Sequence, residues 1–153
     1  MHLLIAGIPA TGKSTFSRWL TAEHGYVRCP STEEPGGDFF GEIARARSQI
    51  GNVVIDWGFP VGQLSRVCEL IASGVQGWWF DGDRDAAFQN FKNRVGYPAD
   101  EAAWHRQLAA IDVGWEEIQA TFHGRELHVV APGPELMPNE ERWERILGSC
   151  RCS

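Results

Sequence analysis

The chain has 153 residues, enough for one compact domain with a single sizeable core. Hydrophobic residues make up 43% and charged residues 22%, as in ordinary globular proteins, and the seven tryptophans predict an aromatic-rich core or pocket. The net charge of −6 makes nucleic acid an unlikely partner, because neutralising its phosphates needs clustered Lys and Arg, but a local site can still hold a small anion.

Apolar runs and helical patterns alternate along the chain, which is typical of an α/β domain with a mostly parallel sheet. The first run is short and continuous, as in a strand that is buried on both faces. The strongest strand signal is the Val-Val-Ile sequence of the third run. The five expected strands are residues 3–6, 26–29, 52–56, 78–80 and 127–131.

The expected helices lie between and after these strands. Gly25, Gly51 and Gly74 follow helical patterns and indicate where three of the helices end. Gly114 lies inside the longest pattern, where glycine costs about 1 kcal/mol, so that segment is either a kinked helix or two helices. The stretch 30–38 is expected to be a loop because it contains Pro35-Gly36-Gly37. The expected helices are residues 13–24, 38–49, 64–71, 83–94, 104–122 and 139–147.

The four cysteines fit a reducing compartment, and we expect a cytoplasmic protein. Cys68 shares the apolar stripe of the helix 64–71 and is expected to be a small core residue. Cys150 and Cys152 complete no zinc-ligand spacing and are interpreted as part of an ordinary tail rather than a metal pair. The apolar residues 2–6 are too few for a signal peptide, and no apolar run is long enough for a membrane span.

One motif carries specific chemistry, and it lies between the first strand and the first helix. Its glycines permit backbone angles closed to other residues, so that successive N–H groups point inward and form an anion-binding nest. The helix that starts at Lys13 adds its positive dipole end. Lys13 can reach the β- and γ-phosphates of a nucleoside triphosphate, and the Ser14 hydroxyl can ligate Mg²⁺. The predicted nucleotide-binding residues are Gly7, Ile8, Pro9, Ala10, Thr11, Gly12, Lys13, Ser14 and Thr15.

From this motif and the order of its elements, the chain resembles the small P-loop kinases, which include nucleoside-monophosphate, shikimate, gluconate and polynucleotide 5′-kinases. The sequence Asp56-Trp57-Gly58-Phe59-Pro60 is similar to the D-G-F-P strand end of nucleotide kinases, and Trp78-Trp79-Phe80-Asp81 followed by a helix ending at Arg94 is similar to their lid region. The resemblance implies a three-layer P-loop NTPase fold with the strand order 2-3-1-4-5. It also implies one domain over residues 1–153, with a lid around residues 94–104.

The resemblance implies that Asp56 holds Mg²⁺ through water together with Ser14. Asp81 competes for this role because it also ends an apolar strand. Asp56 is preferred because its strand is the expected neighbour of the phosphate-loop strand. If neither acid holds metal, a strand-end Asp of this kind caps the following turn.

Arg94 corresponds to the lid arginine that clamps the transferring phosphate in such kinases. Many relatives have a second arginine four residues earlier, but this chain has Asn90 there. Arg84 and Arg106 are the candidates to substitute for it; without a substitute, the lid is weaker. The alternative for Arg94 is a solvated residue at a helix end.

The acceptor side is less well defined. Glu33 is the first candidate for handling the acceptor hydroxyl and Asp38 the second, with Glu34 also in the segment. An exposed loop carboxylate is more often merely solvated. Four aromatic residues could stack on an acceptor, although such residues are more often in the core. They are Phe39, Phe40, Trp57 and Phe59.

The favoured interpretation is an ATP- and Mg²⁺-dependent kinase acting on a small-molecule hydroxyl or phosphate, with Lys13, Arg94 and Glu33 as its catalytic residues. The alternative is an NTPase or nucleotide-binding regulatory module without such an acceptor. The chain has no N-K-x-D guanine motif, which argues against a GTPase. A kinase-like protein that binds nucleotide without catalysis also stays open, because of Asn90.

Overall fold

The computed structural model describes residues 1–29, 41, 43–44, 48, 51–58, 63–96, 98–133 and 135–150, and the statements below concern these residues. The predicted loop 30–38 and most of the predicted helix 38–49 lie outside them.

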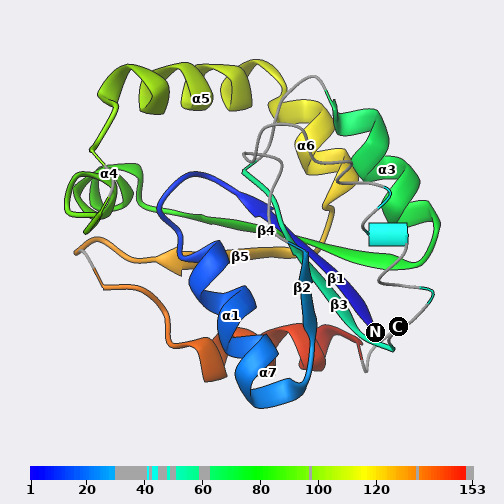
Figure 1. The fold of residues 1–153 in the computed structure, drawn as a ribbon. Helices are drawn as coiled ribbons and strands as arrows, with labels where there is room; N and C mark the ends of the chain where they lie inside the picture. Colours follow the sequence, from blue (N-terminus) through cyan, green and yellow to red (C-terminus); the bar gives the residue numbers. More distant parts are fainter. Residues whose placement is uncertain are drawn as a thin grey trace.

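The centre of the molecule is a five-stranded sheet in which all neighbouring strands run parallel (Figure 1). The strand order is β2-β3-β1-β4-β5, which confirms the predicted order. Because the strands are parallel, their carboxyl ends meet at one edge, where the loop after β1 leaves the sheet. The strands are β1 (His2–Gly7), β2 (Val27–Cys29), β3 (Val53–Asp56), β4 (Val75–Gly82) and β5 (Glu126–Val130).

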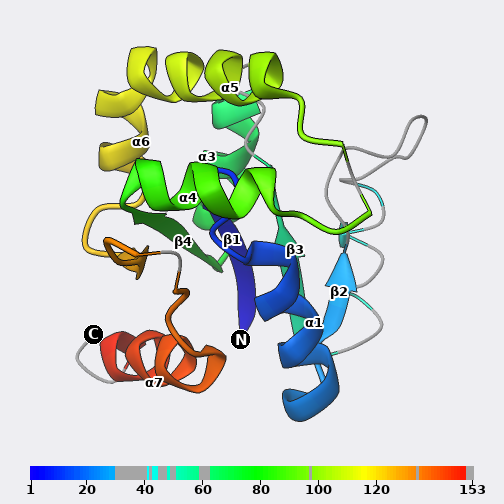
Figure 2. The same cartoon turned by 90° about the vertical axis from the view of Figure 1, so that its left-hand side faces the viewer.

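Helices cover both faces of the sheet, giving the predicted three layers (Figures 1 and 2). The first and last helices lie together on one face, and α3 and α6 lie on the other, while α5 crosses beside α6. The described helices are α1 (Lys13–His24), α3 (Leu64–Ala72), α4 (Arg84–Lys92), α5 (Glu101–Val113), α6 (Trp115–Thr121) and α7 (Asn139–Cys150). In this part of the chain, no helix combines the length and apolar character needed to cross a membrane.

The helix ends follow local chemistry. Gly25 ends α1 in a left-handed conformation with φ 67°, and its N–H donates to the Leu20 carbonyl. Asp83 begins α4 by accepting a hydrogen bond from the Ala86 N–H. Gly114 separates α5 from α6, so the pattern 104–122 is two helices rather than one kinked helix.

The core is rich in aromatic rings, as the tryptophan content predicts. Trp57, Trp78 and Trp79 are fully or almost fully buried within or next to the sheet. Trp104 of α5 is also buried and packs against the rings of Phe88 and Phe91 of α4. Of the two roles considered for Trp57, the structure therefore shows the core one.

The prediction for Cys68 is wrong, because its side chain is exposed. The buried face of α3 runs through Val67 and Leu70, with Ile71 half-buried at its margin. Cys68 lies beside this face, where its Sγ is 3.6 Å from the Thr121 hydroxyl of α6. A helical stripe read from sequence is broader than the face that the sheet covers.

Candidate functional site

The loop after β1 begins at a position that only glycine can occupy. Gly7 has φ 141°, and a Cβ there would lie 2.0 Å from the Phe80 carbonyl oxygen of β4. That same oxygen accepts a hydrogen bond from the Ile8 N–H at 3.1 Å. The close approach therefore fixes the start of the loop directly on the neighbouring strand.

The loop then turns through two left-handed residues into α1. Ala10 has φ 60°, the only positive φ of a non-glycine residue in the described ranges, and Gly12 has φ 75° at the N-cap of α1. The buried Thr11 hydroxyl donates to the Ile8 carbonyl at 2.9 Å and closes the loop on itself. Backbone turns of this type, leading into a helix N-terminus, create the nest and dipole that bind phosphate.

Lys13 folds back across the loop. Its Nζ donates to the carbonyls of Gly7 at 3.1 Å and Ile8 at 2.7 Å, which holds the ammonium group over the loop. Ser14 is partly buried, and Thr15 is exposed in the first turn of α1. The predicted nucleotide-binding segment therefore forms one continuous loop and helix start, and the Lys13 ammonium group is held against the loop carbonyls.

Asp56 lies at the carboxyl end of β3, paired in register with Ile5 of β1. The carboxylate is almost completely buried, and its Oδ2 accepts a hydrogen bond from Arg28 Nη2 of β2 at 2.7 Å. Its Oδ1 is buried and has no hydrogen-bond partner among the described residues. An unsatisfied buried carboxylate oxygen is uncommon and is a group that a metal-bound water can satisfy.

Asp81, the competing acid, is used locally. Its Oδ1 accepts from the Gly82 N–H at 2.8 Å, and its Oδ2 accepts from the Trp79 indole N–H at 3.3 Å. Both carboxylate oxygens therefore have protein partners, whereas Asp56 keeps one oxygen unengaged. Within the described ranges, no group of three or more His, Cys, Asp or Glu side chains is placed to hold a metal ion.

Arg94 lies just beyond α4, which both overall views place beside the phosphate loop (Figures 1 and 2). The side chain is exposed, and its guanidinium stacks over the Phe91 ring at 5.3 Å. One helical turn earlier, the Asn90 Nδ2 is buried without a partner among the described residues. Arg94 is thus exposed and engaged with an aromatic ring of α4.

The two arginines considered as substitutes for a second clamp are engaged with acids of the α5 region. Arg84 binds Asp112 through two hydrogen bonds of 2.6 and 3.1 Å, and the hydrogen bond to Asp112 raises the pKa of Arg84. Arg106 lies 3.7 Å from an Asp100 carboxylate oxygen. The acceptor candidates Glu33, Glu34 and Asp38, like Phe39, Phe40 and Phe59, lie outside the described residues.

Sequence reasoning missed one residue of this region, Arg142 of α7. It is buried, and its Nη1 lies 3.3 Å from the Thr11 carbonyl and 3.4 Å from the Gly12 carbonyl of the loop. Burial lowers the pKa of Arg142 to about 10. The available signal was its spacing: Arg142 lies four residues before the buried Ile146 and so shares the inner face of the helix.

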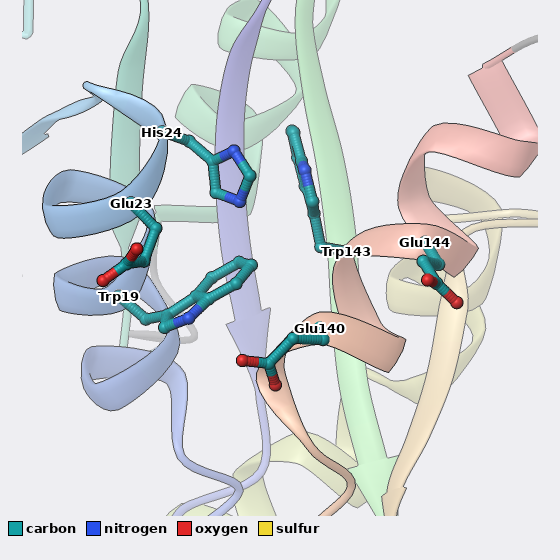
Figure 3. Close-up of a pocket in the computed structure, with 6 residues that line it drawn as sticks. All are labelled: Trp19, Glu23, His24, Glu140, Trp143 and Glu144. Atoms are coloured by element: carbon teal, nitrogen blue, oxygen red, sulfur yellow. The ribbon is translucent and has the colours of Figure 1, made fainter.

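A pocket of about 590 Å³ lies elsewhere, between the last turns of α1 and the start of α7 (Figure 3). The rings of Trp19, His24 and Trp143 follow one another there, with centroid distances of 4.7 and 5.1 Å. Because three of the lining residues are glutamates and α1 begins at the phosphate loop, this pocket is separate from the loop and unsuited to phosphate. Its lining residues are Trp19, Glu23, His24, Glu140, Trp143 and Glu144.

No protein-family model matches the sequence, and no curated protein matches it significantly. Solved structures do match. A gluconokinase from Sinorhizobium meliloti 1021 aligns with a TM-score of 0.60 at 15% identity, covering 99% of this chain and 92% of that one. A deoxyadenosine kinase from M. mycoides with bound dATP aligns with a TM-score of 0.61 at 13% identity, covering 99% and 100%.

A shikimate kinase from Aquifex aeolicus vf5 aligns with a TM-score of 0.58 at 18% identity, covering 99% of this chain and 96% of that one. The three kinases differ in the substrates that their names specify, and they share the architecture over almost their full lengths. Sequence identities this low establish the architecture alone. The chain has the fold of the small P-loop kinases.

Proposed function

We propose that the protein is a kinase that transfers the γ-phosphate of ATP to a hydroxyl or phosphate group of a small molecule. The observation that carries this proposal is the preformed loop from Gly7 to Ser14. It combines two glycines at positive φ, a helix N-terminus and the Lys13 ammonium group on a fold shared with small-molecule kinases.

In the proposed reaction, an acceptor oxygen attacks the γ-phosphorus, the bond from that phosphorus to the β–γ bridging oxygen breaks, and ADP leaves. The loop N–H groups hold the phosphates, and Lys13 balances the charge that moves toward the leaving oxygen. Glu33 is our candidate to accept the acceptor's proton when the acceptor group is a hydroxyl. Water must be excluded from the γ-phosphate if transfer is to exceed hydrolysis.

Mg²⁺ is the proposed metal, and Asp56 and Ser14 would hold it. Magnesium sites in such enzymes use one or two protein ligands plus waters and phosphate oxygens, so a larger acid cluster is not required. The unsatisfied Oδ1 of Asp56 supports this choice, as does the full local engagement of Asp81. When bound, the metal would neutralise charge on the β- and γ-phosphates.

We propose that Arg94 acts as a lid clamp on the transferring phosphate and that the chain is one kinase-like domain. Because Trp104 is buried against two α4 rings, we centre the moving part of the lid on residues 94–100 rather than on the whole stretch to 104. The Arg94 side chain would exchange its contact with Phe91 for the phosphate.

A transfer screen tests the proposal. Purified protein is incubated with γ-labelled ATP, Mg²⁺ and a library of nucleosides, nucleotides, sugars, sugar acids and antibiotics, with Lys13→Ala as the control. We expect label in one acceptor class with the wild-type protein only. Slow release of inorganic phosphate with no labelled acceptor would favour the NTPase or regulatory-module alternative. No Lys13-dependent turnover of either kind would contradict catalysis.

A further inference from the structure

A buried cation of the last helix packs against the proposed phosphate loop. Arg142 of α7 is 1% exposed, and its guanidinium lies behind the loop, on the side of Gly12. A Cβ added to Gly12 would lie 3.1 Å from its Nη1, so the guanidinium packs directly against this glycine. Residues 131 positions apart in sequence therefore meet in the loop that is proposed to bind the phosphates.

All hydrogen bonds found for Arg142 go to backbone carbonyls. Its Nε donates to Met137 at 2.8 Å, while Nη1 lies 3.3 and 3.4 Å from the carbonyls of Thr11 and Gly12. The guanidinium carbon also lies 5.5 Å from the Phe80 ring centroid, within cation–π range. Among the described residues, no carboxylate forms an ion pair with Arg142. Burying a cation without a counter-ion lowers the stability of the fold, so its presence here suggests a function that offsets this loss.

The contacts between Arg142 and the loop carbonyls affect the direction in which the loop N–H groups point. In a trans peptide, the C=O and the following N–H point in opposite directions. When Arg142 holds the Thr11 carbonyl from behind, the Gly12 N–H points away from Arg142. The Gly12 carbonyl accepts the first hydrogen bond of α1, from the Phe16 N–H at 2.9 Å, so the helix itself sets the direction of the Lys13 N–H, and Arg142 Nη1 lies 3.4 Å from the same oxygen. These are N–H groups of the nest, and they cannot turn inward unless their partner carbonyls turn outward.

We propose that Arg142 is a positioning residue for phosphate binding, which orients the Gly12 N–H group through the Thr11 carbonyl and leaves its own charge to be balanced by the bound phosphates. This inference rests on the proposed function and names a part of its machinery. Arginine suits the position because its planar fork reaches several carbonyls at once and stays charged, which lysine cannot reproduce. The ligand class is any oligophosphate that fills the loop.

The test compares Arg142→Met with Arg142→Lys and with Arg145→Met. Arg145 is a matched control on the same helix, because its side chain is 54% exposed and pairs with Glu141. Arg145→Met therefore removes one positive charge, as Arg142→Met does, but from a side chain that does not contact the loop. Binding of Mg·ADP and of inorganic tripolyphosphate is measured by calorimetry, and the Tm of each nucleotide-free variant by calorimetric melting. Because tripolyphosphate has no nucleoside, its affinity measures the phosphate contribution alone.

We expect Arg142→Met to bind both ligands about tenfold more weakly or worse, as for loss of a charge-assisted set of hydrogen bonds. Its nucleotide-free Tm should equal or exceed that of Arg145→Met, because an unpaired buried charge is replaced by an apolar chain of similar length. Arg142→Lys should bind several-fold more weakly than wild type. A merely structural role would instead lower the Tm and leave the affinity of the folded protein unchanged.

Unchanged tripolyphosphate affinity in folded Arg142→Met would overturn the inference, as would a loss confined to Mg·ADP. If Arg142→Met does not fold, Arg142→Lys decides: weaker binding supports the inference, and wild-type affinity overturns it. A wild-type protein that binds neither ligand would instead remove the proposed function, and this inference with it.

Discussion

At the scale of single residues, the two glycines of the loop between β1 and α1, the proposed phosphate loop, serve different purposes. Gly7 is needed because β4 lies against it, with the Phe80 carbonyl oxygen 2.0 Å from where a Cβ would be. Gly12 is needed because it caps α1 at φ 75° and because the Arg142 guanidinium packs on it. A side chain is therefore excluded at Gly7 by the neighbouring strand β4 and at Gly12 by its left-handed backbone and the buried Arg142.

Gly7→Ala should lower the free energy of unfolding by about 3 kcal/mol or more, since the backbone of Phe80 cannot give way cheaply. Gly25→Ala is the matched control: Gly25 also has positive φ, but nothing lies within 4 Å of its Cβ position, so only about 1 kcal/mol of strain is expected. Urea unfolding measures both. Equal losses in the two variants would show that the contact with β4 is unimportant.

Asp56→Asn should reduce Mg²⁺-dependent turnover by at least tenfold while changing nucleotide affinity much less, because it removes the charge proposed to hold Mg²⁺ through water and preserves the side chain's shape. Asp81→Asn should have a smaller effect, since its oxygens serve Gly82 and Trp79. Melting curves control for the loss of the Arg28 pair. If Asp81→Asn proves the more damaging, the metal role belongs to Asp81.

At the scale of elements, the helices α4 and α5 form the surroundings of the proposed lid. Trp104 packs against Phe88 and Phe91 near the connecting segment, and Arg84 at the start of α4 joins Asp112 near the end of α5. The two helices are therefore held together both close to the connection and far from it. The connection at 94–100 contains Gly96 at φ 90° with open space around it. A hinge movement would therefore be confined to this short segment.

Arg94→Ala should reduce phosphoryl transfer more than it weakens ATP binding, because a lid clamp acts on charge that develops in the transition state. Arg66→Ala is the control, since Arg66 is an exposed arginine of α3 that pairs with Glu69. Amide exchange at 94–100 should slow when nucleotide and acceptor are both present. Equal exchange with and without ligands, in a protein whose Arg94→Ala variant is fully active, would exclude the lid.

The ion pair between Arg84 of α4 and Asp112 of α5 also predicts how Asp112 titrates. The hydrogen bond from Arg84 lowers the pKa of Asp112, so the contribution of this pair to stability is present above the pKa of an unfolded Asp. It is lost as the pH falls through the lower, folded-state pKa. NMR titration should place Asp112 below the ordinary Asp range, and Arg84→Met should return it toward that range. An unchanged pKa in Arg84→Met would contradict the pairing.

The sequence predicts most of the elements because their signals are local. Gly25 ends α1, Asp83 begins α4, and the Val-Val-Ile run is β3, each from a few neighbouring residues. Cys68 fails because burial depends on which part of a helical stripe the sheet covers. Arg142 is missed because it looks like one more charge in a polar helix: its spacing from Ile146 indicates the inner face of α7, but only the packing of α7 against the loop shows that it reaches the loop carbonyls.

At the scale of the whole molecule, the net charge is −6, yet cations are concentrated where the proposed phosphates bind. Lys13 lies over the loop, and Arg142 lies behind it. The parallel sheet places the carboxyl ends of β1 and β3 side by side, and so it brings Asp56 to the same edge as this loop. A local cationic site in an acidic protein favours a small anionic ligand over a nucleic acid.

The central claim is that this loop binds a nucleoside triphosphate, and calorimetric titration of Mg·ATP into the wild-type protein and Lys13→Ala tests it most directly. We predict one site per chain in the wild-type protein and at least tenfold weaker binding in a folded Lys13→Ala variant, because the nest survives but its ammonium group does not. Absence of binding in the wild-type protein, or equal affinity in the two proteins, would contradict the account.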